Sequence, residues 1–308
     1  MLILSEADVQ ALLTAADAVP VVEESFRRVA AGSVTMVPRE RLPFEGGSLA
    51  VMPAVDAELG YAGLKSYVAV DGQVTFAVLL FSLEDGSLVA VIEADLLGRF
   101  RTGAASAVAA KHLARPGASS LGVIGCGRQA ETQVGAIRAA VPSIETVVAS
   151  CRTPERLAAF CERVGAEGGD SPRDAAEQDV VVTATTARDP VLRGEWLSPG
   201  ALVCAIGANR AGARELDNVV LQRATFVCCD WREQARRESG DLVEPIEAGV
   251  LDWLEVHELH EVVAGELRGR ARDDDIVVFK SNGIAAWDLA VAAEAVDRAR
   301  ERGVGREL

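Results

Sequence analysis

The stretch "SLGVIGCGRQAETQVGAIRA", residues 120–139, decides the fold, because a short apolar run leads directly into a glycine-rich turn and then a helical pattern. Its G-x-G-x-x-A spacing allows a tight turn, a close approach of the backbone to a pyrophosphate, and close packing of helix on strand. The amides at the start of the helix then bind the phosphates. We therefore predict a dinucleotide site whose contacts include Gly125, Gly127, Arg128, Gln129 and Ala130.

The same alternation of apolar runs and helical patterns continues through the C-terminal half of the chain. Such alternation predicts a Rossmann-type, doubly wound parallel sheet with helices on both faces, in an α/β protein. The apolar runs span residues 120–125, 146–150, 179–186, 201–208, 224–230 and 275–281.

The residues before Gly117 follow a different pattern, which predicts a second, α+β domain. Ser5 and Asp8 form a helix-starting box, and a further helix is expected at 97–113. Asp85-Gly86 is a hairpin signal, so we expect an antiparallel or mixed sheet. Its strands are predicted at 48–55, 61–70, 75–82 and 88–94.

The domain boundaries follow from this change of pattern. We predict a first domain over residues 1–116, completed by the long helix of residues 284–308, and a dinucleotide-binding domain over 117–283. No strand is expected after the final helix, which we expect to return to the first domain.

Composition limits the partners and the compartment. Hydrophobic residues make up 49% of the 308 residues, and the net charge of −15 comes with no polybasic run, so we expect a globular protein without a nucleic-acid partner. Six scattered cysteines suggest buried free thiols in a reducing compartment. Without a leader pattern or a long apolar span, we expect a cytoplasmic protein with no membrane association.

Two histidines, His257 and His260, invite a metal interpretation. Their H-E-L-H spacing differs from the H-E-x-x-H pattern that places two imidazoles and a general base on one helix. We therefore predict no metal site, and we interpret residues 256–263 as a surface loop.

The end of the second predicted strand bears on the choice of cofactor. NAD is usually bound there by a carboxylate, but this chain has Ser150, Cys151, Arg152 and Thr153. Arg152 can meet a 2′-phosphate, with hydrogen bonds from Ser150 and Thr153, so NADP(H) is favoured over NAD(H). The alternative is a solvated Arg152 preceding a helix that begins at Pro154.

Four stretches in order, "RTGAASAVAAKHLAR" (101–115), "GVIGCGRQAETQ" (122–133), "CAIGANRAGARELD" (204–217) and "FKSNGIAAWDLAVA" (279–292), are distinctive together. In them the chain resembles the ornithine cyclodeaminase and mu-crystallin family over nearly its whole length. Members include cyclodeaminases, alanine dehydrogenases, ketimine and pyrroline-carboxylate reductases, and the NADPH- and thyroid-hormone-binding mu-crystallin. The resemblance implies a homodimer paired through its first domains, with the substrate in the cleft between the two domains.

The resemblance also implies roles for particular residues. Arg39, Lys65 and Arg101 correspond to contacts for the substrate carboxylate, and Thr102 to a contact for the cofactor phosphate. Fixed cations would orient an α-amino or α-imino carboxylate by paired hydrogen bonds. Asp288 also matches the family pattern, either in the site or as an anchor of the domain crossing. The expected contacts on the nicotinamide side are Ser281, Asn282 and Gly283.

Two positions depart from the cyclodeaminases. Asn209 stands where they carry an acid/base aspartate, and Ala50 where they carry a glutamate. Asparagine can hold an amine by hydrogen bonding but cannot take its proton. We therefore predict an NADPH-dependent reductase of cyclic α-imino acids resembling pyrroline- or piperideine-carboxylate, with Lys65 and Asn209 as catalytic candidates and Lys65 as proton donor or electrostatic helper.

Three alternatives remain. An amino-acid dehydrogenase would form the imine itself and need ammonia. A cyclodeaminase would release ammonia from ornithine without net change of the cofactor. A protein like mu-crystallin would hold NADPH and a small ligand without useful turnover.

Overall fold

A computed structural model describes residues 1–308, and the chain divides into two compact units. Unit 1 comprises Met1–Arg101 and Gly283–Leu308, and unit 2 comprises Thr102–Asn282. The division falls inside helix α3 (Asp95–Leu113), which begins two residues before the predicted helix. The functional assignment of a substrate and dimerisation domain and a dinucleotide domain stays a prediction.

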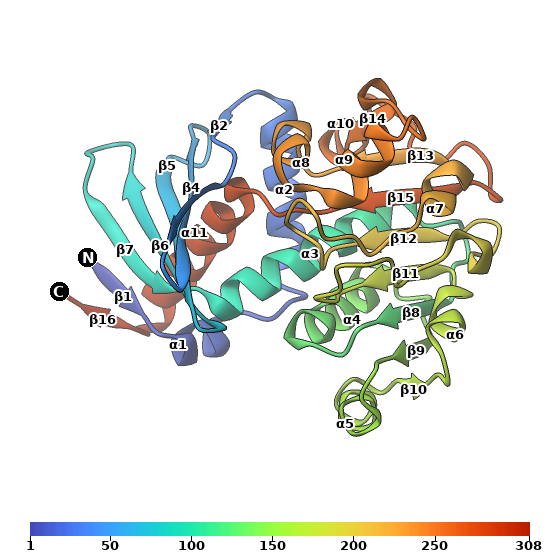
Figure 1. The fold of residues 1–308 in the computed structure, drawn as a ribbon. Coiled ribbons are helices and arrows are strands. Elements are labelled where there is room, and N and C mark those ends of the chain that lie inside the picture. Colours follow the sequence, from blue (N-terminus) through green and yellow to red (C-terminus); the bar gives the residue numbers. More distant parts are fainter. The chain divides into compact units, whose positions relative to one another are not determined.

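Unit 2 is built on an eight-stranded sheet in which every pairing is parallel (Figure 1). Buried, β-branched runs such as Val180–Thr183 fit strands that are covered on both faces. The chain order reverses at β8, whose neighbours are β9 and β11. This is the switch point at which open α/β sheets bind ligands. The order is β10 (Glu167–Gly168), β9 (Thr146–Ser150), β8 (Ser120–Ile124), β11 (Val180–Thr183), β12 (Leu202–Ala205), β15 (Ile276–Lys280), β13 (Ala224–Cys229) and β14 (Val256–Glu258).

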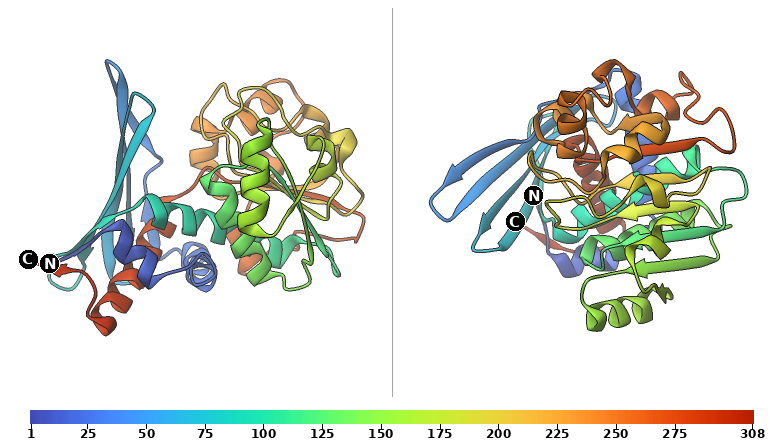
Figure 2. Two further views of the ribbon diagram at one scale, coloured as in Figure 1. Left: turned by 90° about the horizontal axis from the view of Figure 1, so that it is seen from below. Right: turned by 45° about the vertical axis from the view of Figure 1, so that its right-hand side comes forward.

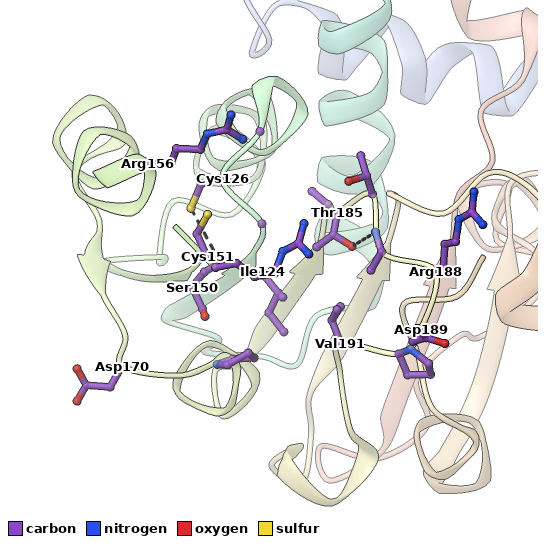
Figure 3. A pocket seen from close by; sticks show the side chains of 18 residues that line it. Ile124, Cys126, Ser150, Cys151, Arg156, Asp170, Thr185, Arg188, Asp189 and Val191 are labelled. Atoms are coloured by element: carbon purple, nitrogen blue, oxygen red, sulfur yellow. Dashed lines mark hydrogen bonds between the residues drawn. The ribbon is translucent and has the colours of Figure 1, made fainter. Parts of the chain in front are cut away.

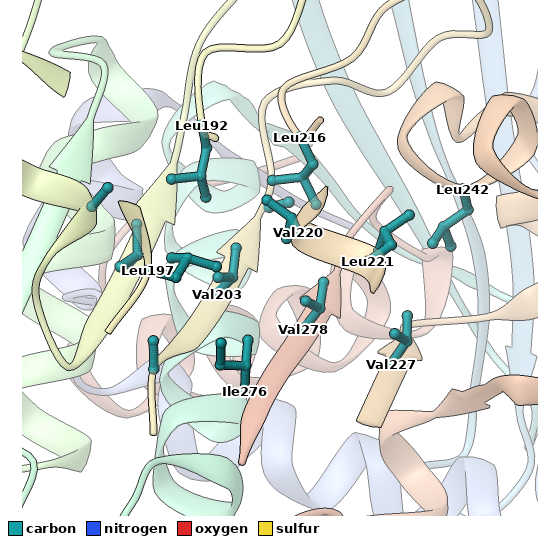
Figure 4. Packing of buried hydrophobic residues seen from close by; sticks show 14 of the residues in the cluster. Leu192, Leu197, Val203, Leu216, Val220, Leu221, Val227, Leu242, Ile276 and Val278 are labelled. Atoms are coloured by element: carbon teal, nitrogen blue, oxygen red, sulfur yellow. The ribbon is translucent and has the colours of Figure 1, made fainter. Parts of the chain in front are cut away.

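Helices cover this sheet and complete its core. Val203, Val227 and Val278 project from three strands into an apolar cluster that Val220 of α7 and Leu242 of α9 close (Figure 4). The helices of unit 2 are α4 (Arg128–Ala140), α5 (Pro154–Val164), α6 (Pro172–Ala176), η1 (Gly194–Trp196), α7 (Asn218–Arg223), α8 (Arg232–Glu238), α9 (Gly240–Glu247), η2 (Trp253–Glu255) and α10 (Leu259–Val263).

Unit 1 contains the predicted mixed sheet. Its central strands are antiparallel, β1 and β7 are parallel, and β3 pairs only with β4. β1 and β16 pair, so the two chain termini lie side by side in both views of Figure 2. The strands are β1 (Leu2–Leu4), β2 (Val34–Met36), β3 (Glu40–Phe44), β4 (Gly47–Asp56), β5 (Tyr61–Val70), β6 (Gln73–Ser82), β7 (Leu88–Glu93) and β16 (Arg306–Glu307).

Helices α1 (Glu6–Leu12), α2 (Ala18–Ala30) and α11 (Ala285–Arg302) complete unit 1. The predicted box at the start of α1 is confirmed, because the side chains of Ser5 and Asp8 each accept a hydrogen bond from the other's backbone. The final helix α11 packs against β4 and β5. Its Trp287 contacts Phe26 of α2 edge to face, with ring centroids 5.1 Å apart. This packing fixes the first turn of α11 beside the sheet.

Two predictions of local structure are corrected. Residues 256–263 form strand β14 and helix α10 instead of a loop, since Val256 and Leu259 are fully buried and hold this segment in the core. A short strand, β16, follows the final helix, because the backbone returns to pair with β1. The two-residue strand β10 was also missed, because it carries no apolar pattern.

All six cysteines are free thiols, as predicted. Only Cys204, Cys228 and Cys229 are buried, whereas Cys126, Cys151 and Cys161 are partly exposed. No helix of the chain is both long enough and apolar enough to span a membrane.

Candidate functional site

The glycine loop has the geometry that its sequence predicts. Gly125 follows β8 with a φ of +111°, and a Cβ there would lie 2.5 Å from the carbonyl oxygen of Ala184, so a larger residue would clash. Gly127 caps helix α4, with no atom within 4 Å of the place a Cβ would take. Ala130 is fully buried beneath the loop. The backbone is thus open to a phosphate at the helix start.

A pocket of about 570 Å³ lies beside this loop (Figure 3). Its walls come from the ends of the two strands at the switch point, with Ile124 from β8 and Thr185 just after β11. Further walls come from the end of β9, from the loop of residues 186–191, and from Arg156, Asp170 and Pro172. The volume and position suit part of a dinucleotide.

The end of β9 brings a cation to this pocket. Ser150 and Arg152 line it, whereas Thr153 is the N-cap of α5 and is not one of its lining residues. Arg156, on the first turn of α5, also lines it and was missed by the sequence analysis. Because Arg152 precedes the helix and Arg156 lies on it, no helical spacing links the two, and the sequence contains no signal for Arg156. Asp170 adds one carboxylate to the same wall.

Three predicted cations come together in unit 1, and we call Arg39, Lys65, Arg101 and the carboxylate of Asp288 the cationic cluster. Each cation is at most 7% exposed and Asp288 is fully buried. Nζ of Lys65 donates to Oδ1 of Asp288 at 3.0 Å, and Nε of Arg101 donates to the same oxygen at 3.1 Å. Arg39 donates to the carbonyl of Gly283 at 3.4 Å.

The cluster draws its members from four separate segments. Arg39 lies in the loop between β2 and β3, Lys65 on β5, Arg101 on α3 and Asp288 in the first turn of α11. Aromatic rings flank two of the cations, with Phe76 5.2 Å from Lys65 and Trp287 5.8 Å from Arg101. Three cations against one carboxylate leave an excess of positive charge that suits an anionic substrate group.

Burial controls the protonation of the cluster. It lowers the pKa of Lys65 from 10.5 to about 8, while Asp288 acts to raise that pKa and the two arginines act to lower it. Burial acts to raise the pKa of Asp288, but Arg101 and Lys65 outweigh it, so this pKa lies below its ordinary value. Asp288 is therefore ionised at neutral pH, and Lys65 can exchange a proton near neutrality.

The loop that carries Asn209 is held by buried charges. Glu215 accepts hydrogen bonds from the backbone amides of Gly207 and Ala208, at 2.7 and 3.1 Å. Lys280 donates to the carbonyl of Ala208 at 2.5 Å and pairs with Asp241 at 2.9 Å. The sequence analysis did not find this network, because its members lie in separate segments with no motif.

Asp230 is another carboxylate that no sequence motif indicated. Its Oδ2 accepts from the backbone of Asn282 at 2.7 Å and from the hydroxyl of Ser281 at 3.2 Å. It therefore fixes the turn that follows β15. Thr102, on α3, is 6% exposed, and neither it nor this turn is among the residues that line the pocket.

His257 and His260 both lie beside other side chains of the protein. His257 stacks on Phe226 with ring centroids 4.8 Å apart, and no group of three potential ligands is placed to hold a metal ion.

The all-parallel sheet, with a glycine loop and a pocket at its switch point, defines a Rossmann-type α/β fold. The chain also matches the model of the ornithine cyclodeaminase/mu-crystallin family over residues 1–303, and it belongs to that family.

Individual relatives agree with this membership. A delta(1)-pyrroline-2-carboxylate reductase from Bacillus cereus is 36% identical, with 88% of each chain covered. The structure of the Thermococcus litoralis delta(1)-pyrroline-2-carboxylate reductase with NADH and L-proline superposes with a TM-score of 0.94, at 31% identity and full coverage of both chains. An archaeal alanine dehydrogenase, solved as a dimer with bound NAD, has a TM-score of 0.93 at 36% identity, covering 100% of this chain and 98% of its own.

These findings confirm the predicted family, the predicted fold class and the predicted enzyme class. The relatives are named as a reductase of a C=N bond and a dehydrogenase of a CH–NH bond, so this family member is placed among oxidoreductases of such bonds.

Proposed function

We propose that this protein is an NAD(P)H-dependent reductase of cyclic α-imino acids of the pyrroline- or piperideine-carboxylate type. The observation that carries the proposal is the cationic cluster, which buries three cations around a single carboxylate. Such a cluster binds an α-carboxylate and favours a substrate with that group beside its C=N bond. The relatives that reduce pyrroline-2-carboxylate support the same substrate class.

The chain's residues take the following roles in this proposal. Arg39 and Arg101 orient the substrate carboxylate, and Lys65 donates a proton to the imine nitrogen or stabilises its charge. Asn209 holds the nitrogen by a hydrogen bond, since its amide does not titrate. The nicotinamide, when bound, supplies the hydride from its C4 to the imine carbon.

We assign the cofactor to the glycine loop and the pocket of unit 2. The proposed contacts are Gly125, Gly127, Arg128, Gln129 and Ala130 of the loop, together with Thr102, Ser150, Arg152, Thr153, Ser281, Asn282 and Gly283. Arg152 and Arg156 line the pocket together, and this pair supports NADP(H) over NAD(H) through a 2′-phosphate. Two relatives were solved with NADH or NAD, so assays with NADPH and with NADH test this preference directly.

We also propose a homodimer in the cytoplasm. The strands β3, β5 and β6 of unit 1 expose Leu42, Phe44, Val68, Val70 and Val74, each by 39% or more, and an exposed apolar surface of this kind supports self-association. An archaeal relative is described as a dimer. Six free thiols without a disulfide suit a reducing compartment.

A second candidate, an amino-acid dehydrogenase, is favoured by the match to the archaeal alanine dehydrogenase over the full length of this chain. Its imine would form from a keto acid and ammonia at the same cationic cluster.

One panel assay separates these functions. Loss of NADPH or NADH absorbance is followed at 340 nm with cyclic imino acids alone, with pyruvate and ammonia, and with L-ornithine. We expect rapid loss with a cyclic imino acid alone. Loss only with keto acid and ammonia would move the assignment to a dehydrogenase, and ammonia release from ornithine without net loss would indicate a cyclodeaminase.

A further inference from the structure

Asp288 lies at the centre of the cationic cluster, and its Oδ1 atom receives hydrogen bonds from two of the three cations. Lys65 Nζ and Arg101 Nε lie 3.0 and 3.1 Å from this single oxygen. The carboxylate is fully buried, and the two cations are 3% and 7% exposed. A single carboxylate oxygen thus links β5 and α3 to the start of α11.

Asp288 is the main group that stabilises the positive charge of Lys65. The charged groups that act on it are Arg39, Arg101 and Asp288, and only Asp288 is an anion. The ring of Phe76, 5.2 Å away, supplies a weaker attraction. A buried ammonium beside two guanidinium groups would lose its proton without such an anion.

Gly98 of α3 shows how closely the ammonium is confined. A Cβ at that position would lie 2.7 Å from Nζ of Lys65, so the helix approaches the amino group at a residue without a side chain. The ammonium is therefore held from two sides, by the helix backbone and by Asp288.

The second oxygen of Asp288 distinguishes this residue from a purely structural anchor. Oδ2 is buried and has no hydrogen-bond partner in the protein. Carboxylates that serve only to fix a helix normally have their buried oxygens satisfied. An unsatisfied oxygen beside two substrate-binding cations is a feature of a working site.

We propose that Asp288 is a positioning residue for imine reduction, which holds Lys65 charged and in place beside Arg101. In this role Asp288 ensures that Lys65 carries the proton that the imine nitrogen receives. The effect of Asp288 on catalysis rests on the proposed reductase function, whereas its effect on the charge of Lys65 does not.

The protein offers a direct test, because its sequence contains only three lysines, at positions 65, 111 and 280. Lysine labelled with ¹³C at Cε gives three NMR signals, and the Lys65→Met variant identifies that of Lys65. Titration of the wild type is expected to give a Lys65 midpoint near pH 8. In Asp288→Asn the midpoint should fall by about one to three pH units, since the nearest anion is lost.

The matched control is Asp297→Asn on the same helix, because Asp297 is 60% exposed and pairs only with exposed Arg300 at 3.9 Å. It should leave the Lys65 midpoint unchanged. If Asp288→Asn fails to fold, Arg101→Gln replaces it, because loss of that neighbouring cation should raise the midpoint. A Lys65 midpoint that is unmoved in the folded Asp288→Asn protein, or unmoved in Arg101→Gln, overturns the proposal.

The catalytic consequence is measured separately. In Asp288→Asn the decline of kcat/KM for a cyclic imino acid with rising pH should move to lower pH by the same amount as the NMR midpoint, while NADPH binding followed by fluorescence persists. Asp288→Asn could shift the NMR midpoint although the wild type does not reduce any cyclic imino acid. That result would refute the proposed function and leave intact the effect of Asp288 on the charge of Lys65. A kcat/KM profile that does not follow the NMR midpoint would refute the positioning role.

Discussion

The proposed cofactor pocket of unit 2 and the cationic cluster of unit 1 are built in opposite ways. The glycine loop of the pocket is one continuous motif, in which Gly125 and Gly127 open the backbone at the start of α4. The cluster depends on four side chains, from Arg39 to Asp288, that only the folded sheet and helices bring together. A backbone site can be recognised from local spacing, whereas a side-chain site needs the tertiary structure.

The two sites also differ in solvation. Arg152 and Arg156 of the pocket are exposed, so water screens their charges. Lys65 and Asp288 are buried, and each therefore depends strongly on the other's charge. Substitutions in the cluster should accordingly reduce activity more than substitutions in the pocket.

Lys65→Met removes the ammonium from the cluster and should have the largest effect. We expect imine turnover to fall by roughly 10²–10⁴-fold, the usual contribution of a positioned proton donor. NADPH binding should persist, as measured by cofactor fluorescence. Lys111→Met, which changes an exposed lysine on α3, serves as the control and should keep full activity. Full activity in Lys65→Met would remove Lys65 from the mechanism.

Arg152→Gln changes the pocket and should leave the cluster unaffected. The KM for NADPH should rise by about 10- to 100-fold, because a charged hydrogen bond contributes about 1.5–3 kcal/mol. The KM for NADH should stay the same. Arg173→Gln, on the exposed surface of α6, is the control. An equal rise in KM for both cofactors would show that Arg152 does not bind a 2′-phosphate.

Gly98→Ala tests the close approach of α3 to Lys65. The added methyl group would lie 2.7 Å from Nζ, so the ammonium must move. We expect kcat to fall about tenfold, within the usual cost of overpacking a buried site. Gly135→Ala on α4 adds the same group where no atom lies within 4 Å, and it should be neutral. Equal behaviour of the two variants would contradict the proposed confinement.

The smallest expected effect is the pH dependence of kcat/KM in the wild type. The pKa of Lys65 lies at about 8, below its ordinary value, and the protonated form is the active one. Activity is therefore full below that pH and is lost as pH rises through it. At about pH 8, kcat/KM should be near half of its plateau, measured under steady-state conditions. A profile that is flat to pH 10 would contradict a protonated Lys65 as donor.

Many of the strands were predicted from the sequence, and the features that were missed have physical causes. The six long apolar runs became strands because burial on both faces of a parallel sheet imposes a simple pattern. The short strand β14 was missed because its burial comes from tertiary packing of Val256 and not from a local pattern. Asp288 appeared only as a match to a family pattern, since its partners lie 187 and 223 residues away.

Deuteride transfer tests the central claim most directly. The wild type is incubated with a cyclic imino acid and NADPH that carries deuterium at C4, on the face that the enzyme uses, and the product is examined by mass spectrometry and NMR. The proposed reductase places one deuterium on the α-carbon of the product for each NADPH consumed. An amino acid formed without deuterium at that carbon, or turnover without net consumption of NADPH, would contradict it.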